Sequence, residues 1–374
     1  MNKCKSLEMK HLRLLLLLAA LMPGAAFSQQ PNREFLLNKG MVTLVDHTEN
    51  SAFTVSFRGD SVQDADHQNL FLVKGSDVKM YQVTRFPIPD KMSFMKYDKP
   101  FERDLLSHFY RFEYWYLRDT VLKQDFDNVT QYFTNQHGKL FLLWHYDMPK
   151  EVTAKERAEI RDKSETGGIV ESQLYILFVT GKYVTMVNMP LESRAQKSKM
   201  ISYLKTYVAN SVRIYPFGIE VDFLDQQLQH IVEGMPLRLA DSTRLVQFEV
   251  PFWLNVSRNQ RHRLVGAFPD VNNFSDLLLF ETYDRTNAPS FDDFMQQTFQ
   301  AGNVDRYKEI PVRDAKMRRY RVEFTLRNGA KAVGEHLYLK VACCYSLVSF
   351  TASYGTYKKN KGRWEEFIKG IRLH

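Results

Sequence analysis

The sequence predicts an α+β protein made of two tandem copies of one domain, each an antiparallel sheet flanked by helices in an α-β-α arrangement. Residues 337–341 and 347–351 show the period-two alternation of strands. Residues 364–371 then carry apolar side chains at helical spacing. The same order of strand, strand and closing helix occurs in residues 173–214, so we expect the unit to occur twice.

Individual residues of the two copies also correspond. Leu174-Tyr175 matches Leu337-Tyr338, Tyr183 matches Tyr345, and residues 211–214 match 370–373. A Gly-Met pair followed by a strand and an Asp-x-Thr turn occurs near residue 40 and again near residue 234. A chain of 374 residues also exceeds one comfortable core. We therefore predict a first domain over 29–216 with a charged insertion at 149–168, a connector at 217–232, and a second domain over 233–374.

The remaining elements follow in pairs. We expect the strand at 53–57 to match 248–256, and the strand at 70–73 to match 277–280. Helices are predicted from 100 to about 115 and at 289–299, the second with Ser290 as N-cap. The central strands are 139–146 and 317–326, and in the latter Tyr320, Val322 and Phe324 should face inward while Arg319 and Arg321 face outward. A polar loop is expected at 355–362, and a short connector helix at 223–231.

The N-terminus has the three-part pattern of a secretory signal peptide. A basic start, an apolar run at 14–21 and a small-residue exit at 24–28 predict cleavage after residue 28. Cleavage removes four basic residues and one acidic residue, which lowers the formal net charge from +8 to +5. A mild charge gives little support for nucleic-acid binding, which favours clustered basic stripes. No later stretch predicts a transmembrane segment. We expect an exported protein, periplasmic or extracellular.

No cofactor or metal motif stands out in the sequence. His108, His137 and His145 match no recognised ligand spacing, and we expect ordinary histidines. The adjacent pair Cys343 and Cys344 favours two free thiols over a vicinal redox or metal pair, because no second Cys pair or His partner accompanies it. No nucleophile elbow or complete phosphate loop is present, and we interpret residues 180–182 as a hairpin turn. We therefore expect no cofactor and no catalytic constellation.

The element order, with the terminal Tyr-x-x-x-Phe-Thr-Ala-Ser and Trp-x-x-Phe-Ile-x-Gly-Ile patterns of residues 345–371, resembles the PsbP/Mog-type fold. The resemblance covers most of both copies and implies an antiparallel sheet flanked by helices. Members of that superfamily are mainly non-enzymatic: extrinsic subunits of membrane complexes, small-GTPase binders and exported envelope proteins. The resemblance transfers no functional residue, because the family has no shared catalytic signature.

Six aromatic residues crowd into the eight positions from 109 to 116. They cannot all face one core from a helix, since its apolar stripe covers only part of the circumference. Some are therefore exposed as a binding surface, or buried against the other domain. We assign a candidate binding surface to Arg111, Tyr114, Trp115, Tyr116 and Arg118. The predicted function is that of an exported, non-enzymatic envelope protein that binds a protein partner or serves as an extrinsic subunit of an envelope complex.

Two other functions stay open at this point. A hydrolase or transferase would use acids such as Glu113 or Asp147 in a cleft between the copies, with raised carboxyl pKa values. A lipid carrier would need a cavity of several hundred cubic ångströms. The basic runs at 313–321 and 358–363 are interpreted as a solvated strand face and a loop rather than as contacts for anionic lipid.

Overall fold

In the computed structural model, the chain forms two compact units. Among the residues that the structure describes, the first unit comprises those of 32–45, 54–88 and 99–212, and the second comprises those of 46–53 and 213–374. The structure describes residues 32–374 except 49–50, 66–69, 76–78, 89–98, 149–169, 182, 216–218, 220–223, 225, 231–233, 235, 242, 261–262, 269–275, 327–328 and 330. The predicted signal peptide and charged insertion, and much of the predicted connector, lie outside the described residues.

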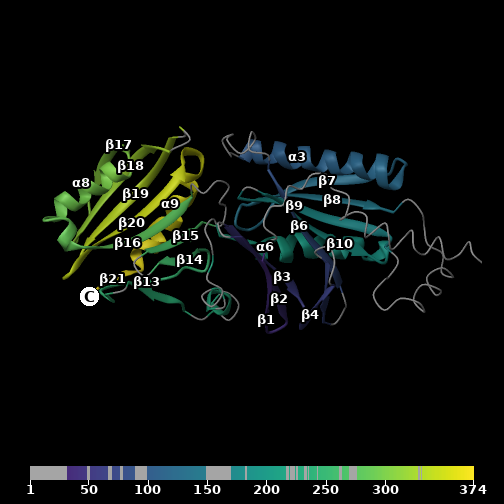
Figure 1. The fold of residues 1–374 in the computed structure, drawn as a ribbon, viewed down its shortest axis with the longest axis horizontal. Coiled ribbons are helices and arrows are strands. Elements are labelled where there is room, and N and C mark those ends of the chain that lie inside the picture. The colour runs from purple at the N-terminus through teal and green to yellow at the C-terminus, as the bar shows by residue number, and fades with distance from the viewer. Residues whose placement is uncertain are drawn as a thin grey trace, which may run out of the picture. The chain divides into compact units, whose positions relative to one another are not determined.

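The first copy starts with a run of strands, continues through a long helix, and ends in a second group of strands and a closing helix (Figure 1). Its strands are β1 (Asn32–Asn38), β2 (Met41–Thr48), β3 (Ser51–Arg58), β4 (Ser61–Ala65), β5 (Leu70–Lys74), β6 (Lys79–Pro87), β7 (Asn128–Thr134), β8 (Leu140–Asp147), β9 (Ser172–Thr180), β10 (Tyr183–Leu191) and β11 (Arg213–Tyr215). Its helices are α3 (Lys99–Tyr116), a π-helix (Leu117–Leu122), a 3-10 turn (Arg194–Gln196), α5 (Lys197–Tyr203), a second π-helix (Leu204–Val208) and α6 (Ala209–Ser211).

The second copy repeats this order among its described residues, without a counterpart of β1. Its strands are β12 (Arg238–Ala240), β13 (Val246–Glu249), β14 (Asn255–Gln260), β15 (Arg263–Ala267), β16 (Leu277–Asp284), β17 (Val304–Ile310), β18 (Met317–Thr325), β19 (Lys331–Lys340), β20 (Cys344–Ser353) and β21 (Ile371–Leu373). Its helices are a 3-10 turn (Arg285–Asn287), α8 (Phe291–Ala301) and α9 (Tyr354–Lys369).

The two copies share one sheet topology, which confirms the predicted α+β duplication. The seven-stranded sheet of the first copy has the order β4-β5-β6-β10-β9-β8-β7, and that of the second has β14-β15-β16-β20-β19-β18-β17. Each copy also has a smaller sheet, in the orders β1-β2-β3-β11 and β12-β13-β21. Neighbouring strands of the large sheets pair antiparallel, as in β9–β10 and β19–β20.

In the second copy, helices cover both faces of the large sheet. On one face, Phe294, Met295 and Phe299 of α8 pack with Val322 and Tyr338. The opposite face packs against α9 and the small sheet, with Trp364 and Phe367 beside Leu337 and Leu339. Leu337 and Tyr338 therefore lie in different clusters, as the period-two alternation of a strand requires. Ser290 accepts a hydrogen bond from the backbone N–H of Asp293, which confirms it as the N-cap of α8.

The first copy is covered in the same way. Helix α3 packs on β8 and β9, where the ring of Tyr110 meets that of Trp144 at 5.3 Å between centroids. On the other face, Lys197 of α5 forms an ion pair of 2.8 Å with Asp147 of β8. Figure 1 draws α3 and α6 on opposite sides of these strands. Of the predicted hairpin turn at 180–182, the structure describes Thr180 and Gly181: Thr180 of β9 pairs with Tyr183 of β10, and the φ of 59° at Gly181 favours glycine.

Arg319 overturns the prediction that it faces solvent, because it is only 8% exposed. Its guanidinium pairs with Glu335, which is fully buried, and with Glu365 of α9. Glu335 also accepts hydrogen bonds from the Trp364 indole at 2.9 Å and the Tyr357 hydroxyl at 2.6 Å. The alternation of the strand was predicted correctly. Helix α9, however, covers the second face of the sheet, so the charged side chains on that face form a buried network instead of facing solvent.

Three other predictions are corrected. The predicted strand 248–256 divides into β13 and β14, which belong to different sheets and are separated by a turn at residues 250–254. The predicted polar loop 355–362 is the first half of α9, capped by Ser353, whose hydroxyl accepts from the backbone N–H of Thr356. By sheet position, β5 corresponds to β15 rather than to β16, so the matching of 70–73 with 277–280 is displaced by one strand.

The edge strands β7 and β17 were not predicted from the sequence. Their side chains are mostly exposed, so they lack the apolar alternation that marks a half-buried strand. They form because β8 and β18 offer free backbone groups for pairing. At the connector, Leu224 and residues 226–230 are helical, as predicted for part of 223–231. No helix in the described part of the chain is long and apolar enough to cross a bilayer.

Candidate functional site

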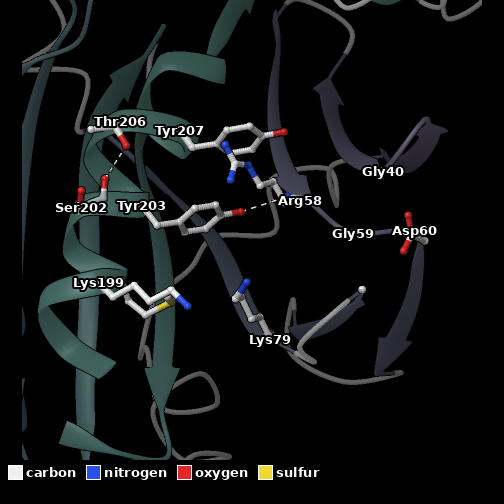
Figure 2. Close-up of a pocket in the computed structure, with 12 residues that line it drawn as sticks. Gly40, Arg58, Gly59, Asp60, Lys79, Lys199, Ser202, Tyr203, Thr206 and Tyr207 are labelled. Carbon is white, nitrogen blue, oxygen red and sulfur yellow. Dashed lines mark hydrogen bonds between the residues drawn. The ribbon is translucent and has the colours of Figure 1, made fainter. Parts of the chain in front are cut away.

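A cavity of about 470 Å³ opens in the first copy between its closing helix and the strands that face it. Its wall comes from the ends of β3 and β5, the start of β6, α5 and the π-helix Leu204–Val208 (Figure 2). Three cationic side chains, two tyrosines and one carboxylate dominate the lining: Arg58, Lys79, Lys199, Tyr203, Tyr207 and Asp60. A cavity of this volume lies within the usual range for small-molecule sites.

Glycines allow the strands to meet closely at this wall. A Cβ on Gly59 would lie 2.3 Å from Cγ1 of Val73 and 2.8 Å from the carbonyl oxygen of Lys74. The backbone N–H of Gly59 donates to the carbonyl of Gly40 at 2.9 Å, and that of Asp60 donates to the carbonyl of Lys74 at 2.7 Å. This close approach fixes the backbone that carries Arg58 and Asp60 at the cavity.

The two tyrosines form a platform on the helix side. The rings of Tyr203 and Tyr207 stack with an interplanar angle of 12° and a centroid distance of 5.4 Å. The Tyr203 hydroxyl accepts from the backbone N–H of Arg58 at 3.0 Å, shown dashed in Figure 2. Burial raises the pKa of both hydroxyls, so both rings stay neutral at physiological pH.

The sequence alone does not reveal this cavity, because its residues come from segments that lie far apart in the chain. The one local signal was the spacing of Lys199, Tyr203 and Tyr207 at i, i+4 and i+8, which places them on one face of a helix. The matching cationic residues Arg58 and Lys79 carry no such pattern, since each ends or begins a strand.

The predicted aromatic cluster lies on α3 and divides between two faces of that helix. Phe112 and Trp115 are each 54% exposed, and Arg111 and His108 are exposed beside them. We call these four residues the outer face of α3. Trp115 and Arg111 therefore lie on an open surface, as the candidate binding surface requires, and Phe112 joins them although the prediction did not select it.

The other residues of the predicted surface lie elsewhere. Tyr114 is half-buried and packs on Phe126 with ring centroids 5.1 Å apart. The Tyr116 hydroxyl is buried without a hydrogen-bond partner among the described residues. Burial, and then the nearby charge of Glu113, raises the pKa of that hydroxyl. Arg118 follows α3 in the π-helix and pairs with Asp119 at 2.6 Å. The structure thus does not gather all five predicted residues into one patch.

The two acids proposed for a catalytic alternative have opposite environments. Burial raises the pKa of Glu113 to about 7, and its Oε1 has no hydrogen-bond partner among the described residues. Burial also acts on Asp147, but hydrogen bonds from Lys197 and Ser172 outweigh it and hold the pKa of that carboxyl low. Neither residue lines the cavity described above. Their geometry does not favour acid–base chemistry at that cavity.

The histidines and cysteines form no metal site in the part of the chain that the structure describes. His108 is exposed on α3, His137 follows β7, and His145 lies in β8. Cys343 is exposed and Cys344 is buried, and both are free thiols. Burial raises the pKa of the Cys344 thiol to about 11, which disfavours the reactive thiolate.

Comparison with known proteins gives little further guidance. No family model matches the chain, and no curated protein matches it significantly. A solved structure from Bacteroides thetaiotaomicron is similar with 11% identity and a TM-score of 0.27, over 37% of this chain and 48% of that one. Cyanobacterial PsbP from Synechocystis is similar with 8% identity and a TM-score of 0.26, over 37% of this chain and 92% of that one. The chain spans about half the length of the Bacteroides protein. The neighbours include a PsbP, at a similarity that carries no argument about function.

Proposed function

We propose that this protein is an exported, non-enzymatic binding protein that captures a protein partner through the outer face of α3. The observation that carries the proposal is the exposure of Phe112 and Trp115, one helical turn apart and each 54% exposed. Large exposed aromatics beside an arginine are the residue types that dominate protein–protein binding energy. The signal-peptide pattern of residues 1–28 supports export.

The second copy supplies an internal comparison for this helix. Helix α8 holds the same place as α3, between the equivalents of β6 and β7, and its exposed residues are Asp292, Asp293, Gln296, Gln297, Gln300 and Ala301. The fold therefore permits an outer face without exposed aromatic rings at this position. Because exposed aromatic surface disfavours solubility, its presence on α3, where α8 has none, supports a role beyond folding.

The proposal is tested with the full chain bearing a C-terminal tag and captured from detergent-solubilised envelope of its source cell. The double variant Phe112→Ser with Trp115→Ser removes the exposed rings and leaves the packed Tyr110 and Tyr114 in place. Leu37→Ser with Tyr354→Ser is the matched control, because these residues are 57% and 50% exposed elsewhere. We expect one partner, identified by mass spectrometry, to be captured by the wild type and the control and lost from the α3 variant.

The same partner, once purified, is then titrated against each protein by calorimetry. Loss of two central aromatic contacts should weaken binding by about 100-fold or more. Equal capture by the α3 variant would exclude this face as the binding surface. A wild-type chain that is folded and captures no partner would contradict the proposed function itself.

A further inference from the structure

We propose that the cavity of the first copy binds a small molecule that carries a phosphate group. Arg58, Lys79 and Lys199 bring three positive charges to a space of about 470 Å³, where Asp60 is the single lining carboxylate among the described residues. The net charge of this lining, +2, complements the dianion that a phosphate monoester forms at neutral pH. This inference does not depend on the α3 surface.

Aromatic rings orient two of the three cations. The Arg58 guanidinium lies 4.6 Å from the centroid of the Tyr207 ring, and the Lys79 ammonium lies 5.2 Å from that of Tyr203. Such contacts orient a cation without neutralising its charge. Figure 2 shows Lys79 and Lys199 extending their amino groups toward each other from β6 and α5. An anion between the two amino groups would find hydrogen-bond donors that are already directed toward it.

The three cations of the cavity have no acidic partner among the described residues, unlike three other cations of the fold. Lys139 pairs with Glu102, Lys197 with Asp147, and Arg319 with two glutamates. Arg58, Lys79 and Lys199 form no ion pair with any described residue, although they share one cavity. Three like charges around one space repel each other, and a bound anion removes that cost.

The local backbone also differs from that of the second copy. The closing helix of the first copy widens into a π-helix at Leu204–Val208, which carries Thr206 and Tyr207 to the cavity wall, whereas α9 is α-helical throughout. Such single-turn π segments occur frequently at functional sites. The strand corner differs as well. At the end of β3, Arg58 lies over the Tyr207 ring, whereas after β13 the indole of Trp253 donates to Glu366 of α9 at 2.9 Å.

This contrast shows that the fold does not require a cationic cavity at this place. In the second copy the corner and the closing helix are joined by a hydrogen bond between neutral and acidic side chains. In the first copy the same two elements present a guanidinium and an ammonium to open space. Arg58 supplies the planar fork suited to phosphate oxygens, and the lysines supply point charges. The polar, cationic lining also does not suit an acyl chain.

The test is isothermal titration calorimetry of the full chain at low ionic strength, with inorganic phosphate, glycerol 3-phosphate and succinate. We expect the two phosphates to bind more tightly than succinate. Arg58→Gln, Lys79→Gln and Lys199→Gln should each weaken phosphate binding about tenfold or more, because each removes a charge-assisted hydrogen bond. All three side chains are exposed or half-buried, so the variants should fold, which thermal unfolding checks.

Lys205→Gln is the matched control. It removes the same charge from the same helix, but Lys205 points to Gln131 and lies over the Phe133 ring. Its phosphate affinity should equal that of the wild type. Flotation with vesicles that contain phosphatidic acid separates the two sources of phosphate: binding lost in the same three variants assigns a lipid headgroup, and binding to soluble phosphates alone assigns a free metabolite. No phosphate binding in either form, or binding that Lys205→Gln weakens as much as Arg58→Gln does, would overturn the proposal.

Discussion

The buried carboxyl of Glu113 gives the sharpest quantitative prediction. Glu113 lies in α3 and is only 5% exposed. Burial raises the pKa of its carboxyl to about 7 from an ordinary value of 4.5. Below pH 4.5 the carboxyl is protonated in the folded and unfolded states, and burial of its charge costs nothing. As the pH rises toward 7 the unfolded state releases the proton and the folded state retains it, so folding stability falls.

The size of this effect follows from the pKa difference. One pKa unit corresponds to about 1.4 kcal/mol. The buried carboxyl therefore lowers the free energy of unfolding by about 3 kcal/mol at pH 8 and by less than about 1 kcal/mol at pH 5. The variant Glu113→Gln stays neutral at every pH. We therefore expect it to gain about 2 to 3 kcal/mol more stability, relative to the wild type, at pH 8 than at pH 5.

The assay is urea denaturation of the full chain at both pH values, with tryptophan fluorescence and circular dichroism to separate the transitions of the two units. Asp104→Asn, an exposed change on the same helix, is the control and should show no such pH dependence. A carbon-13 NMR titration of the Glu113 carboxyl gives its pKa directly. An equal effect of Glu113→Gln at both pH values, or a titration midpoint near 4.5, would refute the reasoning.

Three further predictions concern the second copy. Arg319→Met leaves the fully buried Glu335 without its arginine and should cost about 3 to 5 kcal/mol in urea denaturation; a loss below about 1 kcal/mol would contradict the buried pair. Burial lowers the pKa of His336 to about 4, so its contribution to stability is complete at pH 7 and is lost as the pH falls from 6.5 to 4. His336→Gln should remove about 3 kcal/mol of that acid sensitivity, and an unchanged pH profile would argue against it. Gly334→Ala places a Cβ 2.0 Å from the carbonyl oxygen of Phe350. It should lower the melting temperature by several degrees in calorimetry. An unchanged melting temperature would show that β19 and β20 separate easily.

Much of the fold follows from local sequence patterns. Helix α8 was predicted with its N-cap Ser290, because capping and helical periodicity depend on residues a few positions apart. The hairpins β9–β10 and β19–β20 follow from apolar strands around short turns. Two similar runs of such elements were enough to predict the duplication, which the matching strand orders of the two seven-stranded sheets confirm.

The candidate sites could be predicted from the sequence only in part. The crowding of aromatics around Trp115 predicted that some rings are exposed or buried against the other domain, since one helix face cannot bury six of them. Which rings are exposed was decided by the rotation of α3 on the sheet: it directs Tyr114 toward Phe126 and leaves Phe112 and Trp115 open. That rotation depends on packing against β8 and β9.

The sequence by itself determined the repeated strand and helix order, the capping of α8 and the excess of aromatics before residue 117. Tertiary structure alone decided that Arg319 is buried under α9 and that Arg58, Lys79 and Lys199 share one cavity. The physical reason is the range of the interactions. Propensity, capping and periodicity act over a few residues, whereas charge burial and cavity formation depend on side chains that only the pairing of distant strands brings together.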